Sequence, residues 1–90
     1  MRESTPNDAQ ALALLALATA VSDERRARRF LDLTGIGTDE LRARAGDPAL
    51  LAALIRFLEA HEPDLIACAD DIGATPAQLV TARLTLEKQT

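Results

Sequence analysis

Few side chains in this sequence of 90 residues could act as nucleophiles or metal ligands. It contains one cysteine, Cys68, one histidine, His61, and two serines near the expected starts of helices. Nucleophilic catalysis needs a nucleophile, a base and a group that orients the base, and these residues offer no such set. A metal site would need His61 with Glu62 or Asp64, and that spacing fits no established site. We therefore expect no enzymatic activity, no metal or other cofactor, and no small-molecule substrate.

The cysteine and the histidine are both expected to have structural roles. Cys68 lies on a predicted helix over residues 63–72, with Leu65 and Ile72 at i−3 and i+4, a pattern typical of a buried thiol. His61 is placed on the apolar arc of the preceding helix, in its last turn. A single cysteine excludes an internal disulfide framework, so we expect a cytoplasmic protein.

Arginines form the strongest candidate for a binding site. Six of them lie between Asp23 and Asp47, although the net charge of the whole chain is −4. This balance excludes a protein whose entire surface binds nucleic acid, because phosphate neutralisation needs clustered cations. The candidate partner-binding patch comprises Arg25, Arg28, Arg29, Arg42 and Arg44. The alternative is a solvated helix face, on which Arg28 has acidic residues four positions before and after it.

The composition predicts an all-α fold to position these residues. Hydrophobic residues make up 48% of the chain, mostly Ala and Leu, with two Phe and no Trp or Tyr. These are helix formers, and strand-forming residues are scarce. We predict one domain over residues 1–90, a compact bundle of five to six short helices, with residues 1–4 disordered.

A central helix is predicted over residues 47–62, DPALLAALIRFLEAHE. Asp47 can cap its first turn, and Pro48 suits the first helical position. At 100° per residue, six apolar side chains fall on one broad arc. They are Leu50, Leu51, Leu54, Ile55, Phe57 and Leu58.

The first helix is predicted from an apolar run, Ala9 to Val21, after a start signal at Thr5, Pro6 and Asp8. Two interpretations were weighed, a buried helix and a signal peptide ending near residues 18–20. The run lacks the basic segment that precedes a signal sequence. At 13 residues it is too short to span a bilayer, which takes about 20. We therefore expect a buried first helix and no membrane association.

Two short helices should follow the first one. Ser22 is expected to cap a helix over residues 23–33, and Thr38 another that ends at Gly46. The segment 30–44 partly resembles a helix-hairpin-helix element, which offers backbone amides to a DNA phosphate. Its Gly35-Ile36-Gly37 turn fits that pattern, whereas Leu41 and Arg44 do not. A short turn match of this kind has low specificity.

The last 30 residues predict two helices with a tight turn between them. Glu62 should cap the first, with Pro63 opening it, and Gly73 can end it in a left-handed conformation. Thr75 should cap the second, with Pro76 at its first position and Gln78 completing a capping box.

This last unit also resembles a DNA-binding helix-turn-helix, on the spacing of Ala69, Gly73 and Leu79. The acidic residues Asp70 and Asp71 before its second helix would repel a phosphate backbone. Packing is therefore an alternative reason for the pattern.

The sequence also suggests an internal repeat. A shift of 38 residues superimposes Leu12 on Leu50, Glu24 on Glu62, Gly35 on Gly73 and Leu41 on Leu79. This predicts two three-helix units with helix-turn-helix-like corners. Identities are few, so two similar solutions to helix packing remain an alternative to a true duplication.

The segment RRFLDLTGIGTDELRARAGDPALLAALIRFLEAHEPDLIACADDIGATPAQLV, and above all its LRARAGDP run at 41–48, resembles a family of small alpha-proteobacterial proteins known as domain of unknown function 3572. The resemblance covers most of the chain. It implies a single cytoplasmic helical domain and supplies no activity.

Interaction is the function that remains after these exclusions. The final helix carries Leu79, Ala82 and Leu86 on one stripe, and Val80 and Leu84 on another. Either it packs between two neighbours, or one stripe meets another chain. We expect a non-enzymatic helical domain whose partner is a protein, itself or another, and the alternative is a small DNA-binding helix-turn-helix or helix-hairpin-helix module.

Overall fold

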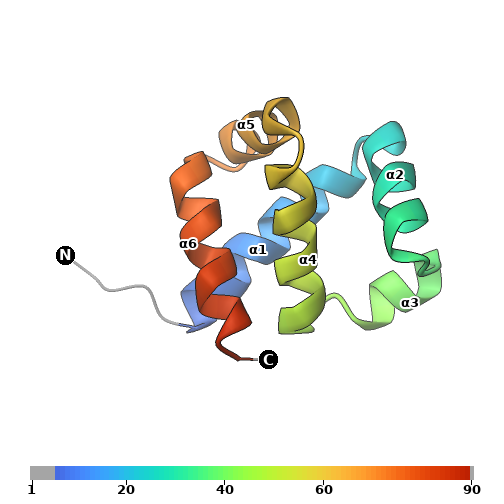
Figure 1. The fold of residues 1–90 in the computed structure, drawn as a ribbon, viewed down its shortest axis with the longest axis horizontal. Coiled ribbons are helices and arrows are strands. Elements are labelled where there is room, and N and C mark those ends of the chain that lie inside the picture. The colour runs from blue at the N-terminus through green and yellow to red at the C-terminus, as the bar shows by residue number, and fades with distance from the viewer. Residues whose placement is uncertain (1–5, 90) are drawn as a thin grey trace.

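The computed structural model describes residues 6–89, with side chains from residue 8 onward. These residues form six α-helices and no strand (Figure 1), which confirms the all-helical prediction. The expected disorder of residues 1–4 and the expected cap at Thr5 lie outside the described residues. The helices are α1 (Pro6–Val21), α2 (Glu24–Thr34), α3 (Thr38–Ala43), α4 (Pro48–Glu59), α5 (Glu62–Asp71) and α6 (Pro76–Glu87).

Helix α4 is the centre of the fold, as predicted. It packs against α1, α5 and α6 (Figure 1). All six residues of its predicted apolar arc are buried, together with Ala52. The Asp47 side chain accepts a hydrogen bond from the Ala49 amide, and Pro48 is the first helical residue. Local capping and one wide apolar face therefore account for both the start and the place of this helix.

Helix α1 is buried on one side only, so the prediction of a buried first helix is wrong for its other side. Its buried residues include an alanine stripe, Ala9, Ala13, Ala16 and Ala20. Small side chains allow the close approach of α4 and α6 to this stripe. The opposite side keeps Leu15 53% exposed.

Three of the predicted caps are wrong by one residue. Asp23, not Ser22, caps α2, because its carboxylate accepts from the Arg26 amide at 3.0 Å while the Ser22 hydroxyl donates to the Thr19 carbonyl. That amide bond lowers the pKa of Asp23. The other two caps are Gly37 before α3 and His61 before α5, and neither makes a side-chain capping bond.

The last predicted cap is confirmed in full. The Thr75 hydroxyl accepts from the Gln78 amide at 3.1 Å, and the Gln78 side chain accepts from the Thr75 amide at 2.8 Å. This reciprocal pair fixes the start of α6. The first of its two apolar stripes, Leu79, Ala82 and Leu86, is buried between α1 and α4, and Leu84 of the second stripe is 49% exposed.

Gly35 and Gly73 end α2 and α5 with φ of +74° and +72°. An L-residue in this region costs roughly 1–2 kcal/mol, and an added Cβ would meet no atom within 4 Å at either site. We therefore expect Gly35→Ala and Gly73→Ala each to lower the free energy of unfolding by about 1 kcal/mol in urea denaturation.

The matched control for this prediction is Gly46→Ala. Gly46 has no positive φ, and its added Cβ would make an ordinary contact of 3.5 Å with the side-chain nitrogen Nε2 of Gln10. Its free energy of unfolding should change by no more than about 0.5 kcal/mol. Equal losses for all three variants would show that left-handed strain is not the cause.

Candidate functional site

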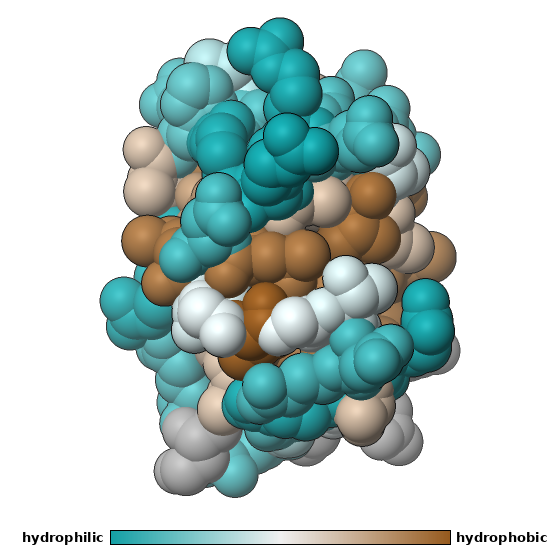
Figure 2. Space-filling view, turned by 90° about the vertical axis from the view of Figure 1, so that its right-hand side faces the viewer, coloured by the Kyte–Doolittle hydropathy of each residue, from teal (hydrophilic) through white to brown (hydrophobic). Residues whose placement is uncertain are grey.

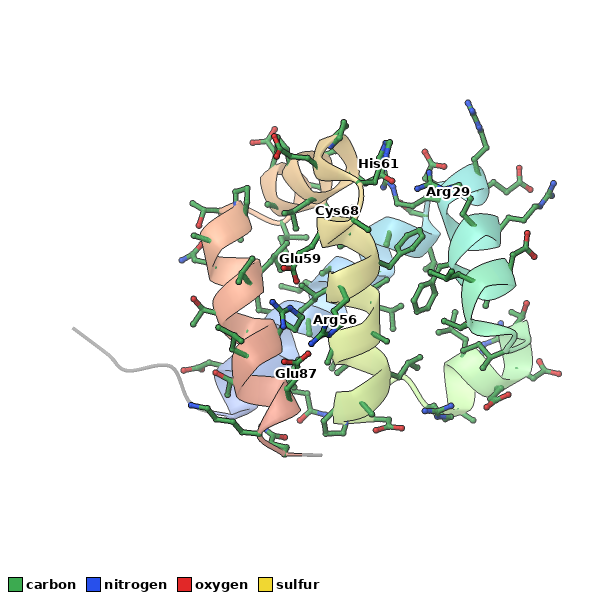
Figure 3. All side chains as sticks on the ribbon, viewed as in Figure 1. Arg29, Arg56, Glu59, His61, Cys68 and Glu87 are labelled. Atoms are coloured by element: carbon green, nitrogen blue, oxygen red, sulfur yellow. The ribbon has the colours of Figure 1, made fainter. Side chains whose placement is uncertain are left out.

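The structure splits the predicted arginine patch into paired and unpaired members. Arg29 points toward α4 and α5 with its side chain half exposed (Figure 3): its Nη2 donates to Asp64 Oδ2 at 3.2 Å, and its Cζ lies 5.3 Å from the centre of the Phe57 ring. This combines an ion pair with a cation–π contact between α2, α4 and α5. Arg29 therefore contacts α4 and α5 while half of its side chain remains exposed.

Arg26, which the sequence analysis did not include in the patch, is the most enclosed arginine of this cluster. Its Nε lies 3.3 Å from Asp64 Oδ1, and its side chain is only 14% exposed. Its Nη1 contacts the Cys68 sulfur at 3.5 Å. Because these partners lie 38 and 42 residues away in sequence, no local spacing signal could have identified them.

Arg44 is also held by carboxylates of its own segment. It bonds Asp47 through Nε at 3.2 Å and Nη2 at 2.9 Å, and Glu40 through Nη1 at 3.1 Å. The Asp47 bond raises the pKa of Arg44, and the Arg44 bond lowers the pKa of Asp47. These contacts tie the end of α3 to the start of α4.

Arg25, Arg28 and Arg42 are the members of the predicted patch that stay available. Within residues 8–89, Arg25 and Arg28 have no acidic side chain within 4 Å, so the expected i, i+4 pairs of Arg28 are not formed. Arg42 lies 4.0 Å from Asp39, and both side chains are almost fully solvated, which makes this a weak pair. The five predicted residues therefore do not form one continuous site.

The structure buries Cys68 and leaves His61 exposed. Cys68 is fully buried, as predicted, and burial raises the pKa of its thiol. His61 is exposed at the start of α5, so its predicted place on the apolar arc of α4 is wrong (Figure 3). The described residues contain no group of three His, Cys, Asp or Glu side chains that could hold a metal ion.

An apolar groove that the sequence analysis missed lies between α1, α2 and α3. It has a volume of about 510 Å³. Four of its ten lining residues belong to α1, two to α2 and four to α3 and the segment after it: Leu14, Leu17, Ala18, Val21, Ala27, Leu31, Thr38, Leu41, Arg42 and Ala45. A sequence signal existed, because Leu14, Ala18 and Val21 form an i, i+4, i+7 stripe apart from the alanine stripe of α1. Only the three-dimensional arrangement shows that no helix covers it.

Apolar surface continues onto the side of the molecule formed by α2 and α3. Figure 2 looks onto this side and shows an apolar band between two hydrophilic regions. Leu33 at the end of α2 is 73% exposed. Exposed apolar patches larger than single side chains often mark binding surfaces, so the groove and this band together are the candidate site.

The family described as "Protein of unknown function (DUF3572)" matches residues 6–89, nearly the whole chain. The chain belongs to the DUF3572 family. No curated protein and no solved structure gives a significant match.

In this DUF3572 domain, an ion-pair network links α4 to α6 (Figure 3). Arg83 donates to both Glu59 carboxylate oxygens and, at 3.0 Å, to Glu87, which also accepts from Arg56 Nε at 2.6 Å. Arg83 and Glu87, four positions apart on α6, thus pair within a larger set. Arg83 is consequently held by carboxylates on α4 and α6.

Glu87 should make the stability of this DUF3572 domain pH-dependent. Its bond to Arg56 lowers its pKa below the ordinary value of 4.5. A lowered folded-state pKa stabilises the fold above pH 4.5, and this contribution is lost as the pH falls through the folded-state value. In urea unfolding between pH 7 and pH 3, Glu87→Gln should therefore lose less stability than the wild type.

The control for this experiment is Glu24→Gln, on an exposed carboxylate that has no ion pair within 4 Å in residues 8–89. Its pH profile should follow that of the wild type. Parallel profiles for all three proteins would refute the role assigned to Glu87.

None of the helices within residues 6–89 is long and apolar enough to cross a bilayer.

Proposed function

We propose that this chain is a non-enzymatic, cytoplasmic protein-interaction domain that binds another protein through the groove between α1, α2 and α3. The observation that supports the proposal is the groove itself, an open apolar hollow of about 510 Å³ in a chain of 90 residues. Small-molecule sites usually enclose most of the surface of their ligand. This groove is mostly apolar and open to solvent, which fits a protein surface better.

Site-specific photocrosslinking in the source cells tests this proposal. A photoreactive amino acid at Ala18, an exposed groove residue of α1, should give a discrete protein adduct. The matched control is the same amino acid at Ala60, which is also an exposed alanine but lies at the end of α4 outside the groove. No adduct at Ala18, or the same adducts at both positions, would refute the groove as the binding surface.

A second pair of variants tests whether the adduct depends on the apolar lining. Leu14 and Leu84 are similarly exposed, at 37% and 49%, and only Leu14 lines the groove. Leu14→Glu should abolish crosslinking from Ala18, and Leu84→Glu should leave it unchanged. Circular dichroism will show whether both variants remain folded.

The runner-up function is DNA binding through the free arginines of α2. It is supported by Arg25 and Arg28, which are exposed and have no ion pair within 4 Å among residues 8–89. Against it, the cation within α6, Arg83, is paired with Glu59 and Glu87, which disfavours α6 as a recognition helix. We regard protein binding as the better-supported function.

Titration with a random duplex separates the two functions. DNA binding predicts amide shifts at low salt over residues 24–34 that weaken steeply with added salt and disappear in an Arg25→Gln, Arg28→Gln double variant. Arg29 is left intact because its contacts to Asp64 and Phe57 support the fold. An unchanged spectrum would eliminate the DNA-binding function.

A further inference from the structure

We infer that the occupant of the groove is an amphipathic helix of a partner protein, with acidic residues beside its apolar stripe. This inference rests on the proposed function and names the chemistry of the partner. It is drawn from a comparison of the two halves of the chain and from the charges at the groove.

The two halves share one local design. Helices α2 and α5 begin at Glu24 and Glu62, and α3 and α6 begin at residues 38 and 76, each 38 residues apart. The turns between them contain Gly35 and Gly73, with nearly the same positive φ. Leu41 and Leu79 are buried at equivalent positions of the third helix of each unit. The predicted pseudo-repeat is thus visible in the secondary structure.

The third helix is where the two units differ. In the second unit, α6 has 12 residues, runs along α4 and buries Leu79, Ala82 and Leu86 (Figure 1). In the first unit, α3 has six residues and ends at Ala43, shortly before Gly46 and Pro48. It does not run along α1, and the groove lies between them. Where the second unit has a helix–helix contact, the first has an open apolar hollow.

This difference indicates the shape of the occupant. The stripe of Leu14, Ala18 and Val21 repeats at helical spacing along α1, so it matches the stripe of a second helix laid beside it. Residues at i, i+3 or i+4, and i+7 of such a helix would reach the groove, a common mode of helix recognition.

The charge at the groove indicates which kind of residue lies beside the apolar stripe of this helix. The groove has Arg42 and no carboxylate among its lining residues. Arg42 has only a long, solvated contact of 4.0 Å with Asp39. A carboxylate on the partner would complement this cation, and a basic helix would be repelled.

Size favours a single helix over a second copy of this chain. A standard stable interface involves roughly 20–30 residues on each side. The groove has ten lining residues, and one wall is the six-residue helix α3. This suits a helix of three or four turns.

Three synthetic 15-residue helical peptides test the inference by ¹⁵N NMR titration to 1 mM. The first has leucines at i, i+3, i+7 and i+10 with glutamates on both flanks. The second replaces every glutamate with lysine, and the third has the composition of the first with the leucines scattered around the helix. The first peptide should shift amides of residues 14–21 and 38–45 and bind at least tenfold more tightly than the other two.

Substitutions in the protein test whether the peptide binds in the groove. Arg42→Gln should weaken binding of the acidic peptide several-fold, and Leu14→Glu should abolish it. Leu84→Glu is the control for an exposed leucine outside the groove, and it should bind as the wild type does.

Each contrary result has a distinct meaning. Equal binding of the acidic and basic peptides would overturn the charge assignment and leave the groove as an interaction surface. If none of the three peptides shifts the groove amides, the inference that a helix occupies the groove is refuted. The proposed protein-binding function is tested separately by crosslinking from Ala18. Groove shifts that depend on protein concentration without peptide would identify a second copy as the occupant and overturn the inference.

Discussion

Leu54→Ala will lower the free energy of unfolding by about 3–5 kcal/mol. Leu54 is fully buried near the middle of α4, the helix that contacts α1, α5 and α6. Removing its isopropyl group leaves a cavity that rigid neighbouring helices cannot fill. A 90-residue domain has a total stability of about 5–13 kcal/mol, so this single change removes a large share of it.

Two controls separate cavity formation from changes in helix propensity. Leu33→Ala makes the same substitution within a helix, at a side chain that is 73% exposed, and should cost less than about 1 kcal/mol. Leu54→Met keeps most of the volume and should cost less than about 1.5 kcal/mol. Urea denaturation at pH 7 measures all three. Similar losses for Leu54→Ala and Leu33→Ala would show that α4 is not the packing centre.

The number of helices and the position of the central helix could be predicted from the sequence because the signals that determine them are local. Asp47 with Pro48, and Thr75 with Gln78, act within four residues of each other, and the structure contains both sets of bonds. The errors in capping were also local. Ser22 and Asp23 compete for the same helix start, and which side chain reaches a free amide depends on backbone angles that the sequence does not display.

The candidate site could not be predicted in the same way. Arg29 is exposed, as expected of a charged helix face, but its ion-pair partner Asp64 is 35 residues away, so no local spacing could indicate the pair. The groove depends on the early end of α3 and on its distance from α1, which is a tertiary property. Local periodicity could have identified the stripe on α1, but it could not show which stripe is covered.

Phe30→Ala should also cost about 3–5 kcal/mol, but with a different structural consequence. Among the described residues of α2, Phe30 is the only one that is fully buried. Its ring packs edge-on against Phe57 of α4, with ring centres 5.3 Å apart and an interplanar angle of 61°. Because so much of the attachment of α2 depends on this pair, its loss should release α2 before the rest of the domain unfolds.

Native-state hydrogen exchange distinguishes local release from global destabilisation. In Phe30→Ala, amides near the end of α2 should lose much more protection than those of α4 and α6. Phe30→Leu provides a graded control, because it keeps an apolar side chain and loses the edge-to-face ring contact, worth about 0.5–1.5 kcal/mol beyond its buried area. Equal loss of protection in all helices would contradict local release and place α2 in the same cooperative unit as α4. Since α2 forms one wall of the groove, local release would also weaken binding of the acidic peptide.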